Sequence, residues 1–100
     1  MIRGGAVYIM TNKRNGTLYT GVTSDLKKRV WQHRNSVFSE SFTAKYKCHI
    51  LVYYQGYSRI EEAIGHEKRI KGGNRLAKLK LIEEKNPQWN DLWEEVEKWN

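Results

Sequence analysis

Five side chains in this sequence lie where a small domain ordinarily needs only packing residues. Two are phenols in apolar, β-rich stretches, and three are polar groups at helical positions whose spacing directs them inward: Tyr8, Tyr19, Arg29, His33 and Glu67. A guanidinium can hold a phosphate, a carboxylate can bind a divalent cation, and phenol or imidazole groups can orient or deprotonate water. If they converge, these are the side chains that phosphodiester cleavage requires.

The sequence offers one inward carboxylate for a metal ion. Glu61 and Glu62 lie off the face of Glu67 by helical phase, whereas two-metal nucleases generally need several carboxylates. We therefore expect a single divalent cation. Cys48 is the only cysteine, so it has no partner for an internal disulfide or a C-x-x-C metal site, and we expect it to pack as a small hydrophobe.

Each of the five side chains also has an ordinary structural explanation. Tyr8 and Tyr19 could pack against each other across two strands. Arg29 and Glu67 could form an internal ion pair, and His33 could be a core histidine with satisfied hydrogen bonds. For any one residue the structural explanation is the better one. Together the five favour a site, because a small domain rarely tolerates so many inward polar groups that do not converge.

The two phenols belong to a predicted β-hairpin. Residues 6–11 and 17–23 are rich in β-branched and aromatic types, and between them Asn15 and Gly16 favour a type I′ turn.

A two-residue turn at these positions would set the pairing of the hairpin. It would place Tyr8 opposite Thr23 and Met10 opposite Gly21, with Tyr19 nearer the turn on the same face. Gly21 would then leave a hollow over the backbone that another group could approach closely.

The segment after the hairpin predicts an amphipathic helix that carries two of the polar groups. Thr23 or Ser24 is a suitable N-cap. Arg29 lies one turn before the histidine of the inner stripe. That stripe follows the spacing i, i+4, i+7 and i+11 at Leu26, Val30, His33 and Val37.

The rest of the chain predicts one more strand and three more helices. Residues 49–57 are a nearly continuous apolar run of strand length. A capping box at Ser58 and Glu61 opens the second helix, which carries Glu67 and ends at Gly72. The third helix has Leu76, Leu79 and Ile82 inward, and the fourth begins with Asn86-Pro87 and carries Trp89, Leu92, Trp93 and Val96 on one face.

The composition is that of a folded, soluble protein. The chain has 100 residues, 39% hydrophobic and 29% charged, and we expect one domain over residues 1–100. The apolar run in MIRGGAVYIM is too short for a secretory or membrane-spanning segment, so we expect a cytoplasmic location.

The net charge of +7 is unevenly distributed. Residues 1–80 hold sixteen Lys and Arg against five Asp and Glu, or +11, whereas residues 81–100 hold two against six, or −4. A basic surface attracts phosphate backbones, although charge alone does not distinguish DNA from RNA or from an anionic membrane. We expect a nucleic-acid partner and no membrane.

These residues resemble the motifs of the GIY-YIG nuclease family. The resemblance begins with AVY at residues 6–8 and YTG at residues 19–21, the two motifs that name the family. It continues with Arg29 and His33 in LKKRVWQH and with Glu67 in AIGHEKRIK. The resemblance covers roughly residues 6 to 87. The sequence is similar above all to small stand-alone bacterial members of the family.

The resemblance implies an α+β fold, with a small three-stranded antiparallel sheet flanked by helices. It also implies metal-dependent hydrolysis of nucleic acid, with one Mg²⁺ or Mn²⁺ ion bound by Glu67. Arg29 would stabilise charge on the scissile phosphate, and Tyr8 would activate the attacking water. Tyr19 and His33 would position water or phosphate and share proton transfer.

Three further positions are compared with the family through the same resemblance. Gly21 is the glycine of the second motif. The late asparagine of the family would fall on Asn86, with Asn74 as a competitor. Val22 stands where some members have a lysine, which removes one contact that would bind phosphate or tune the base.

The leading hypothesis is an endonuclease that acts on DNA, in branched, damaged or single-stranded form, as in repair or recombination. One alternative is a non-cutting, basic nucleic-acid-binding module. Another is a protein-interaction module that exposes Trp89, Trp93 and Trp99. The preferred DNA structure and the oligomeric state stay open.

Overall fold

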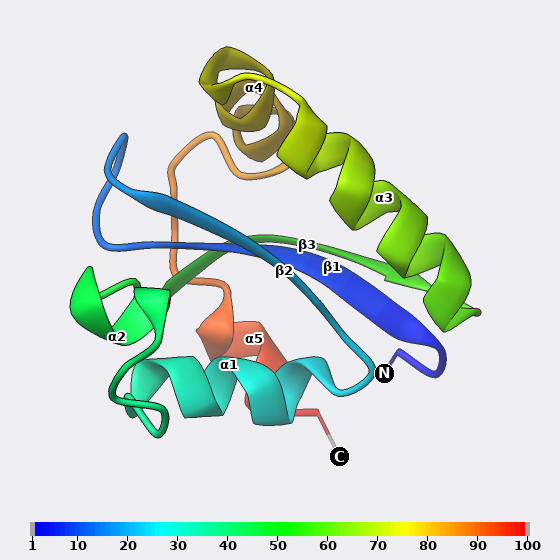
Figure 1. Cartoon of the computed structure of the whole chain (residues 1–100), viewed down its shortest axis with the longest axis horizontal. Coiled ribbons are helices and arrows are strands. Elements are labelled where there is room, and N and C mark those ends of the chain that lie inside the picture. The colour runs from blue at the N-terminus through cyan, green and yellow to red at the C-terminus, as the bar shows by residue number, and fades with distance from the viewer. Residues whose placement is uncertain (1, 100) are drawn as a thin grey trace.

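The computed structural model describes residues 2–99 as three layers, with a sheet between two sets of helices (Figure 1). The predicted α+β class and the three-stranded antiparallel sheet are confirmed, and the strand order is β2-β1-β3. No helix within residues 2–99 is long and apolar enough to cross a lipid bilayer. The elements are β1 (Gly5–Thr11), β2 (Leu18–Thr23), α1 (Leu26–Arg34), α2 (Phe42–Lys45), β3 (Ile50–Tyr57), α3 (Ile60–Gly72), α4 (Arg75–Lys85) and α5 (Trp93–Val96).

The loop of the β1–β2 hairpin is longer than predicted. Thr11 pairs with Leu18, so residues 12–17 connect the strands in place of a two-residue turn. Asn15 has a φ of 57°, but Gly16 does not have the positive φ that a type I′ turn requires at its second position. The predicted turn type is therefore wrong.

The longer loop shifts the pairing by two residues. Tyr8 lies opposite Gly21, and Met10 lies opposite Tyr19. Because successive side chains alternate between the faces of a strand, a shift of two residues keeps every side chain on its predicted side. Both tyrosines therefore still share a face.

Each face of the sheet buries its own apolar cluster. Helices α1 and α5 cover one face with side chains that include Leu26, Val30 and Val96. Helices α3 and α4 cover the other with side chains that include Ile70 and Ile82. The central strand β1 is buried along its whole length, since its alternate side chains enter the two clusters in turn.

Two helix starts differ from the predictions. Helix α1 begins after Asp25, whose carboxylate accepts a hydrogen bond from the Lys28 N–H at 3.1 Å, because Thr23 still belongs to β2. The helix ends at Arg34, and Val37 beyond it is 47% exposed. Helix α3 has no side-chain cap, so the predicted capping box does not form.

The predicted fourth helix is reduced to the short α5. Asn86 ends α4 and does not begin a new helix. Trp89 has a φ of 54°, which a continuing right-handed helix does not allow. The tryptophans still close the two clusters: Trp89 is 7% exposed, and Trp93 and Trp99 pack against the cluster under α1. This burial argues against an exposed tryptophan patch.

The C-terminal segment, residues 86–99, forms hydrogen bonds with backbone groups of the edge strand β3. The register between β1 and β3 shifts at Val52, whose carbonyl accepts a hydrogen bond from Asn86 Nδ2 at 3.0 Å. The Leu92 N–H donates to the Leu51 carbonyl at 2.8 Å. The segment thus covers part of an edge that would otherwise be open to another strand.

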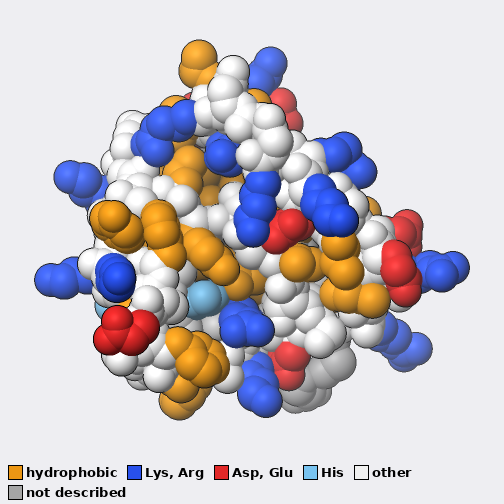
Figure 2. All heavy atoms as spheres, in the orientation of Figure 1, with side chains coloured by type: hydrophobic (Ala, Val, Ile, Leu, Met, Phe, Trp, Pro, Cys, Tyr) orange, Lys and Arg blue, Asp and Glu red, His pale blue; other side chains and the backbone are white. Residues whose placement is uncertain are grey.

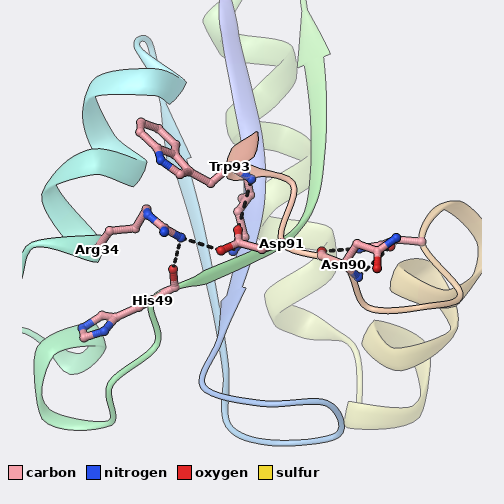
Figure 3. A network of polar contacts seen from close by, with 7 residues as sticks. Arg34, His49, Asn90, Asp91 and Trp93 are labelled. Carbon is pink, nitrogen blue, oxygen red and sulfur yellow. Dashed lines mark hydrogen bonds and ion pairs between the residues drawn. The ribbon is translucent and has the colours of Figure 1, made fainter. Parts of the chain in front are cut away.

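One carboxylate joins this segment to α1 (Figure 3). Asp91 Oδ2 accepts from Arg34 Nη1 at 2.6 Å, and Asp91 Oδ1 accepts the backbone N–H groups of Leu51 and Trp93 at 3.2 and 3.1 Å. Arg34 also donates to the His49 carbonyl at 2.9 Å, and its guanidinium lies 5.5 Å from the centre of the Trp93 ring. Helix α1, strand β3 and the C-terminal segment therefore meet at Asp91.

We expect Asp91→Ala to lower the free energy of unfolding by about 2 to 4 kcal/mol, because it leaves two N–H groups and a guanidinium without their acceptor. Asp91→Asn keeps one acceptor oxygen and should cost less. Urea denaturation measures both. Arg59→Ala, which breaks only the exposed 3.5 Å pair with Glu61, should cost below about 0.5 kcal/mol; an equal loss in the two alanine variants would contradict this assignment.

Candidate active site

A chain of buried hydrogen bonds runs from the sheet through α1 to α2. The Tyr8 hydroxyl lies 2.8 Å from His33 Nε2, and His33 Nδ1 lies 2.7 Å from Thr43 Oγ1. All three side chains are buried. Thr43 Oγ1 lies a further 3.2 Å from Ser41 Oγ. A buried polar group left without a partner costs about 1 to 3 kcal/mol, so these bonds hold the three elements in place.

Gly21 makes room for the Tyr8 ring. A Cβ atom at position 21 would lie 2.5 Å from both Cζ and Oη of Tyr8, and Tyr8 is only 1% exposed and cannot move aside. The phenol therefore fills the hollow over the glycine. The prediction that this hollow is open to an outside group is wrong, because the shifted pairing brings Tyr8 directly opposite Gly21.

Tyr19 lies beside the buried pair and is partly exposed. Its ring centre is 6.3 Å from that of Tyr8 and 5.4 Å from that of His33, which it meets edge-on at 61°. The structure thus brings both predicted phenols and the predicted imidazole into one group.

The Tyr8 phenol holds its proton firmly. Burial raises the pKa of Tyr8 far above its ordinary range, and the neighbouring Tyr19 phenol adds to this increase. The charge of Arg29 lowers the same pKa, and the charge of Glu67 raises it. Both charges therefore act on the Tyr8 hydroxyl, and at neutral pH this hydroxyl is a hydrogen-bond donor.

The His33 imidazole is neutral at neutral pH. Burial lowers the pKa of His33 to about 4, and the positive charge of Arg29 and the neighbouring His49 act in the same direction. A neutral imidazole has one N–H and one acceptor nitrogen. In the tautomer that carries its proton on Nδ1, the Tyr8 hydroxyl donates to Nε2 and the Nδ1–H donates to Thr43 Oγ1.

Arg29 and Glu67 do not form the ion pair that was the structural alternative. Glu67 Oε2 lies 2.8 Å from Lys71 Nζ, one helical turn further along α3, and the Glu67 side chain is 13% exposed. None of the ion pairs within residues 2–99 involves Arg29, which is partly exposed on α1. Within the described residues the guanidinium therefore has no carboxylate partner.

Glu67 suits a hydrated cation better than a closed metal site. No group of three or more His, Cys, Asp or Glu side chains that could hold a metal occurs in the described part of the chain. Mg²⁺ keeps several waters and is usually bound by one or two carboxylates and a substrate phosphate. The pair with Lys71, which is 52% exposed, is worth about 0.3 to 0.5 kcal/mol. The residues present therefore fit a divalent cation, which would displace Lys71.

Neither candidate for the late asparagine joins this group. Asn86 donates to the carbonyls of Val52 and Asn90 and accepts from the Asn90 N–H, all at 3.0 Å, and it lies at the end of α4. Asn74 caps α4 and accepts from the Ala77 N–H at 2.8 Å. Both amides hold the backbone.

Two residues next to the site were not predicted from the sequence. Lys71 lies four residues after Glu67, a spacing that favours an ion pair on a helix and was readable from the sequence. Thr43 is 1% exposed in the four-residue helix α2. No periodicity reveals so short a helix, and only the fold brings Thr43 to His33.

Comparison with known proteins shows the class to which the chain belongs. Residues 4–80 match the model of the GIY-YIG catalytic domain. The chain belongs to the GIY-YIG family, as the motifs predicted, and so carries a nuclease-type domain. Nucleases of this family act on nucleic acid and generally use divalent metal ions.

Within this family the chain is similar to small bacterial proteins. It is 38% identical to the UPF0213 protein of Staphylococcus haemolyticus over 79 residues, which are 79% of this chain and 94% of that protein. It is 37% identical to the UPF0213 protein of Staphylococcus saprophyticus over 78% of this chain and 93% of the relative. No solved structure matches the chain significantly.

We expect Gly21→Ala to lower the free energy of unfolding by about 1 to 3 kcal/mol, because the added methyl group overlaps the buried Tyr8 ring. Chemical denaturation measures the change. Gly72→Ala is the matched control: a Cβ there meets no atom within 4 Å, so stability should be unchanged or slightly higher. Equal stability of the two variants would show that Tyr8 is free to move.

Acid should weaken the fold through His33. Its pKa is about 4 in the folded protein and near 6.5 unfolded, so unfolding takes up a proton between these pH values. The free energy of unfolding should therefore fall by up to about 3 kcal/mol as the pH falls from 6.5 to 4.

Denaturation curves across this pH range, for the wild type and His33→Gln, isolate the contribution of His33. The variant should lack most of the slope, because glutamine does not titrate. His66→Gln, which changes a partly exposed histidine, should keep most of it. Parallel pH profiles for the wild type and His33→Gln would mean that His33 is charged in the fold.

Proposed function

We propose that this chain is a metal-dependent endonuclease that hydrolyses phosphodiester bonds in DNA with one Mg²⁺ or Mn²⁺ ion at Glu67. The observation that supports this proposal is the buried Tyr8 hydroxyl, which is hydrogen-bonded to a neutral His33 and lies within the fields of Arg29 and Glu67. An imidazole, a cation and a carboxylate thus all influence this one hydroxyl. A tyrosine with only a structural role would need the hydrogen bond to His33 and neither of the two charges.

In this proposal Arg29 binds the scissile phosphate. Its guanidinium has no ion-pair partner within residues 2–99, and its planar fork suits two phosphate oxygens. Negative charge grows on these oxygens as water adds to phosphorus, so the guanidinium stabilises the transition state more than the substrate.

Tyr8 and His33 act together on the proton of the attacking water. The pKa of Tyr8 is too high for its phenol to act alone as a base at neutral pH. Its oxygen can take the water proton as its own proton moves to His33 Nε2, 2.8 Å away. The water oxygen bonds to phosphorus, one P–O ester bond breaks, and the leaving oxygen takes a proton from solvent. Tyr19 would position the water or the phosphate.

Glu67 would hold the divalent cation. When bound, such an ion neutralises charge on the phosphate and makes a coordinated water more acidic. Lys71 would give up Glu67 to the ion and stay near the phosphate as a second positive charge.

We propose DNA as the nucleic acid and, on the basis of the resemblance, branched, damaged or single-stranded DNA as the form acted on. The basic region of residues 1–80, with a net charge of +11, supports a polyanionic substrate. The alternative is a basic module that binds nucleic acid and does not cut it. Cleavage assays separate the two.

We expect Glu67→Gln to abolish Mg²⁺-dependent cleavage and leave DNA binding within about twofold, because the amide loses the charge that holds the ion. Gel assays on single-stranded, duplex and branched DNA, with Mg²⁺, Mn²⁺ or chelator, measure cleavage. Fluorescence anisotropy measures binding. Glu62→Gln, an exposed change on the same helix, is the control and should cut normally.

Equal cleavage by Glu67→Gln and the wild type would remove Glu67 from the metal site. Absence of cleavage by the wild type on every substrate, with binding that weakens steeply as salt rises, would favour the non-cutting module.

A further inference from the structure

Three aromatic rings lead away from the candidate active site along the surface. The Tyr19 ring lies 5.8 Å from the Phe42 ring, and the Phe42 ring lies 4.6 Å from the Tyr46 ring, centre to centre. Phe42 is 42% exposed and Tyr46 is 51% exposed. We call these three residues the aromatic row. A face view shows hydrophobic side chains over α2 and β2 next to a histidine, with Lys and Arg side chains around them (Figure 2).

The aromatic row is continuous with the active site. Tyr19 contacts both the buried phenol and the imidazole, at 6.3 Å from Tyr8 and 5.4 Å from His33 between ring centres. Helix α2 is anchored to the same imidazole through Thr43. This threonine is buried, and it lies between Phe42 and Tyr46 in the sequence. The rings of Phe42, in α2, and of Tyr46, its C-cap residue, are therefore held in position relative to the proposed cleavage centre.

The arrangement of the rings leaves surface available to a ligand. Neighbouring planes are tilted by 31° between Tyr19 and Phe42 and by 41° between Phe42 and Tyr46, so the row is stepped. Exposed aromatic rings are unfavourable in water, and ring contacts among themselves cover only part of them. A flat apolar group can cover the rest.

The charges around α2 favour a polyanion. Lys45 and Lys47 flank Tyr46 and are both exposed, and Glu40, also exposed, is the one nearby acidic residue of the segment from Ser39 to Lys47. Rings flanked by lysines are the combination that binds single-stranded nucleic acid, where bases stack on aromatic side chains and phosphates meet positive charge.

We propose that the aromatic row is a base-stacking subsite, in which Phe42 and Tyr46 take an unpaired nucleobase next to the phosphate held at Arg29. The subsite rests on the proposed function for its neighbouring phosphate. It makes the substrate class a phosphodiester beside an unpaired nucleotide. Bases within a duplex are already stacked on both faces, so a fully paired strand cannot use these rings without unpairing.

The first experiment measures binding in the Glu67→Gln background, with chelator, so that no strand is cut. Fluorescence anisotropy gives the affinity for a short single-stranded DNA and for a blunt duplex of the same sequence. Replacing both rings, as Phe42→Leu with Tyr46→Leu, should weaken single-strand binding about tenfold or more. Duplex binding should change less than twofold.

Two controls test whether the rings themselves are responsible. The exchange Phe42→Tyr with Tyr46→Phe keeps both rings and should keep single-strand affinity. Trp31→Leu removes another exposed ring, 51% exposed on α1 outside the row, and should have little effect. Circular dichroism and urea denaturation verify that each variant is folded.

A second measurement reports stacking directly. A strand that carries one 2-aminopurine should lose fluorescence on binding to the protein with both rings, and should lose much less on binding to the double-leucine variant at saturation. This readout separates stacking from a structural effect on affinity, since it is taken with all the strand bound.

Equal loss of affinity for single strand and duplex, or no loss for either, would overturn the subsite. So would a change in oligomeric state in sedimentation with unchanged DNA binding, because the rings would then contact a second copy. If the wild type cuts nothing while the double-leucine variant loses single-strand binding and quenching, the cleavage proposal fails and the subsite stands. If Glu67→Gln alone abolishes cutting and the row has no effect, the subsite fails.

Discussion

The hydrogen bond of the buried Tyr8 hydroxyl is the constraint on which the arrangement of the site depends. A phenol that is 1% exposed must find a partner inside the protein, and His33 on α1 is that partner. The imidazole then needs a partner for its other nitrogen, which Thr43 on α2 supplies. The opposing strand β2 must have no side chain where the Tyr8 ring lies, which requires Gly21. The burial of this one tyrosine thus requires a glycine on β2, a histidine on α1 and a threonine on α2.

The same burial that makes the pair structurally demanding also suits it to the proposed proton transfer. Burial raises the pKa of Tyr8 and lowers that of His33 to about 4, so each favours its neutral form. A neutral pair can pass a proton along a 2.8 Å hydrogen bond with no buried charge in the ground state. Charge would appear only as the water loses its proton, next to a free Arg29. The cost of polar burial and the proposed chemistry are therefore two consequences of one arrangement.

The sequence predicts those features that depend on alternation or helical spacing, and it misses those set by chain geometry. The shared face of Tyr8 and Tyr19 survived an error of two residues in the pairing, because alternation has a period of two. The inward position of His33 followed from its spacing to Leu26 and Val30. Loop length has no such period, so the six residues between the strands could not be read from the turn signal. Helix α2 is too short to show periodicity. Asn86, followed by Pro87, has the pattern of a helix start, and its bond to β3 is a tertiary contact that the sequence does not reveal.

Residues beyond the family match complete the support of the site. The family model covers residues 4–80, whereas Asp91 and Trp93 come later and bind α1 through Arg34. Arg34 follows His33 directly, and Arg29 lies on the same helix, so a contact that fixes the end of α1 to β3 also fixes the imidazole and the guanidinium relative to Tyr8. The bond at Asp91 is worth only a few kcal/mol, but a small domain has only about 5 to 15 kcal/mol in total. Loss of this contact would therefore loosen the end of α1 next to His33 before the protein unfolds, while the bonds of His33 to Tyr8 and Thr43 and the packing of Leu26 and Val30 would still hold the helix on the sheet.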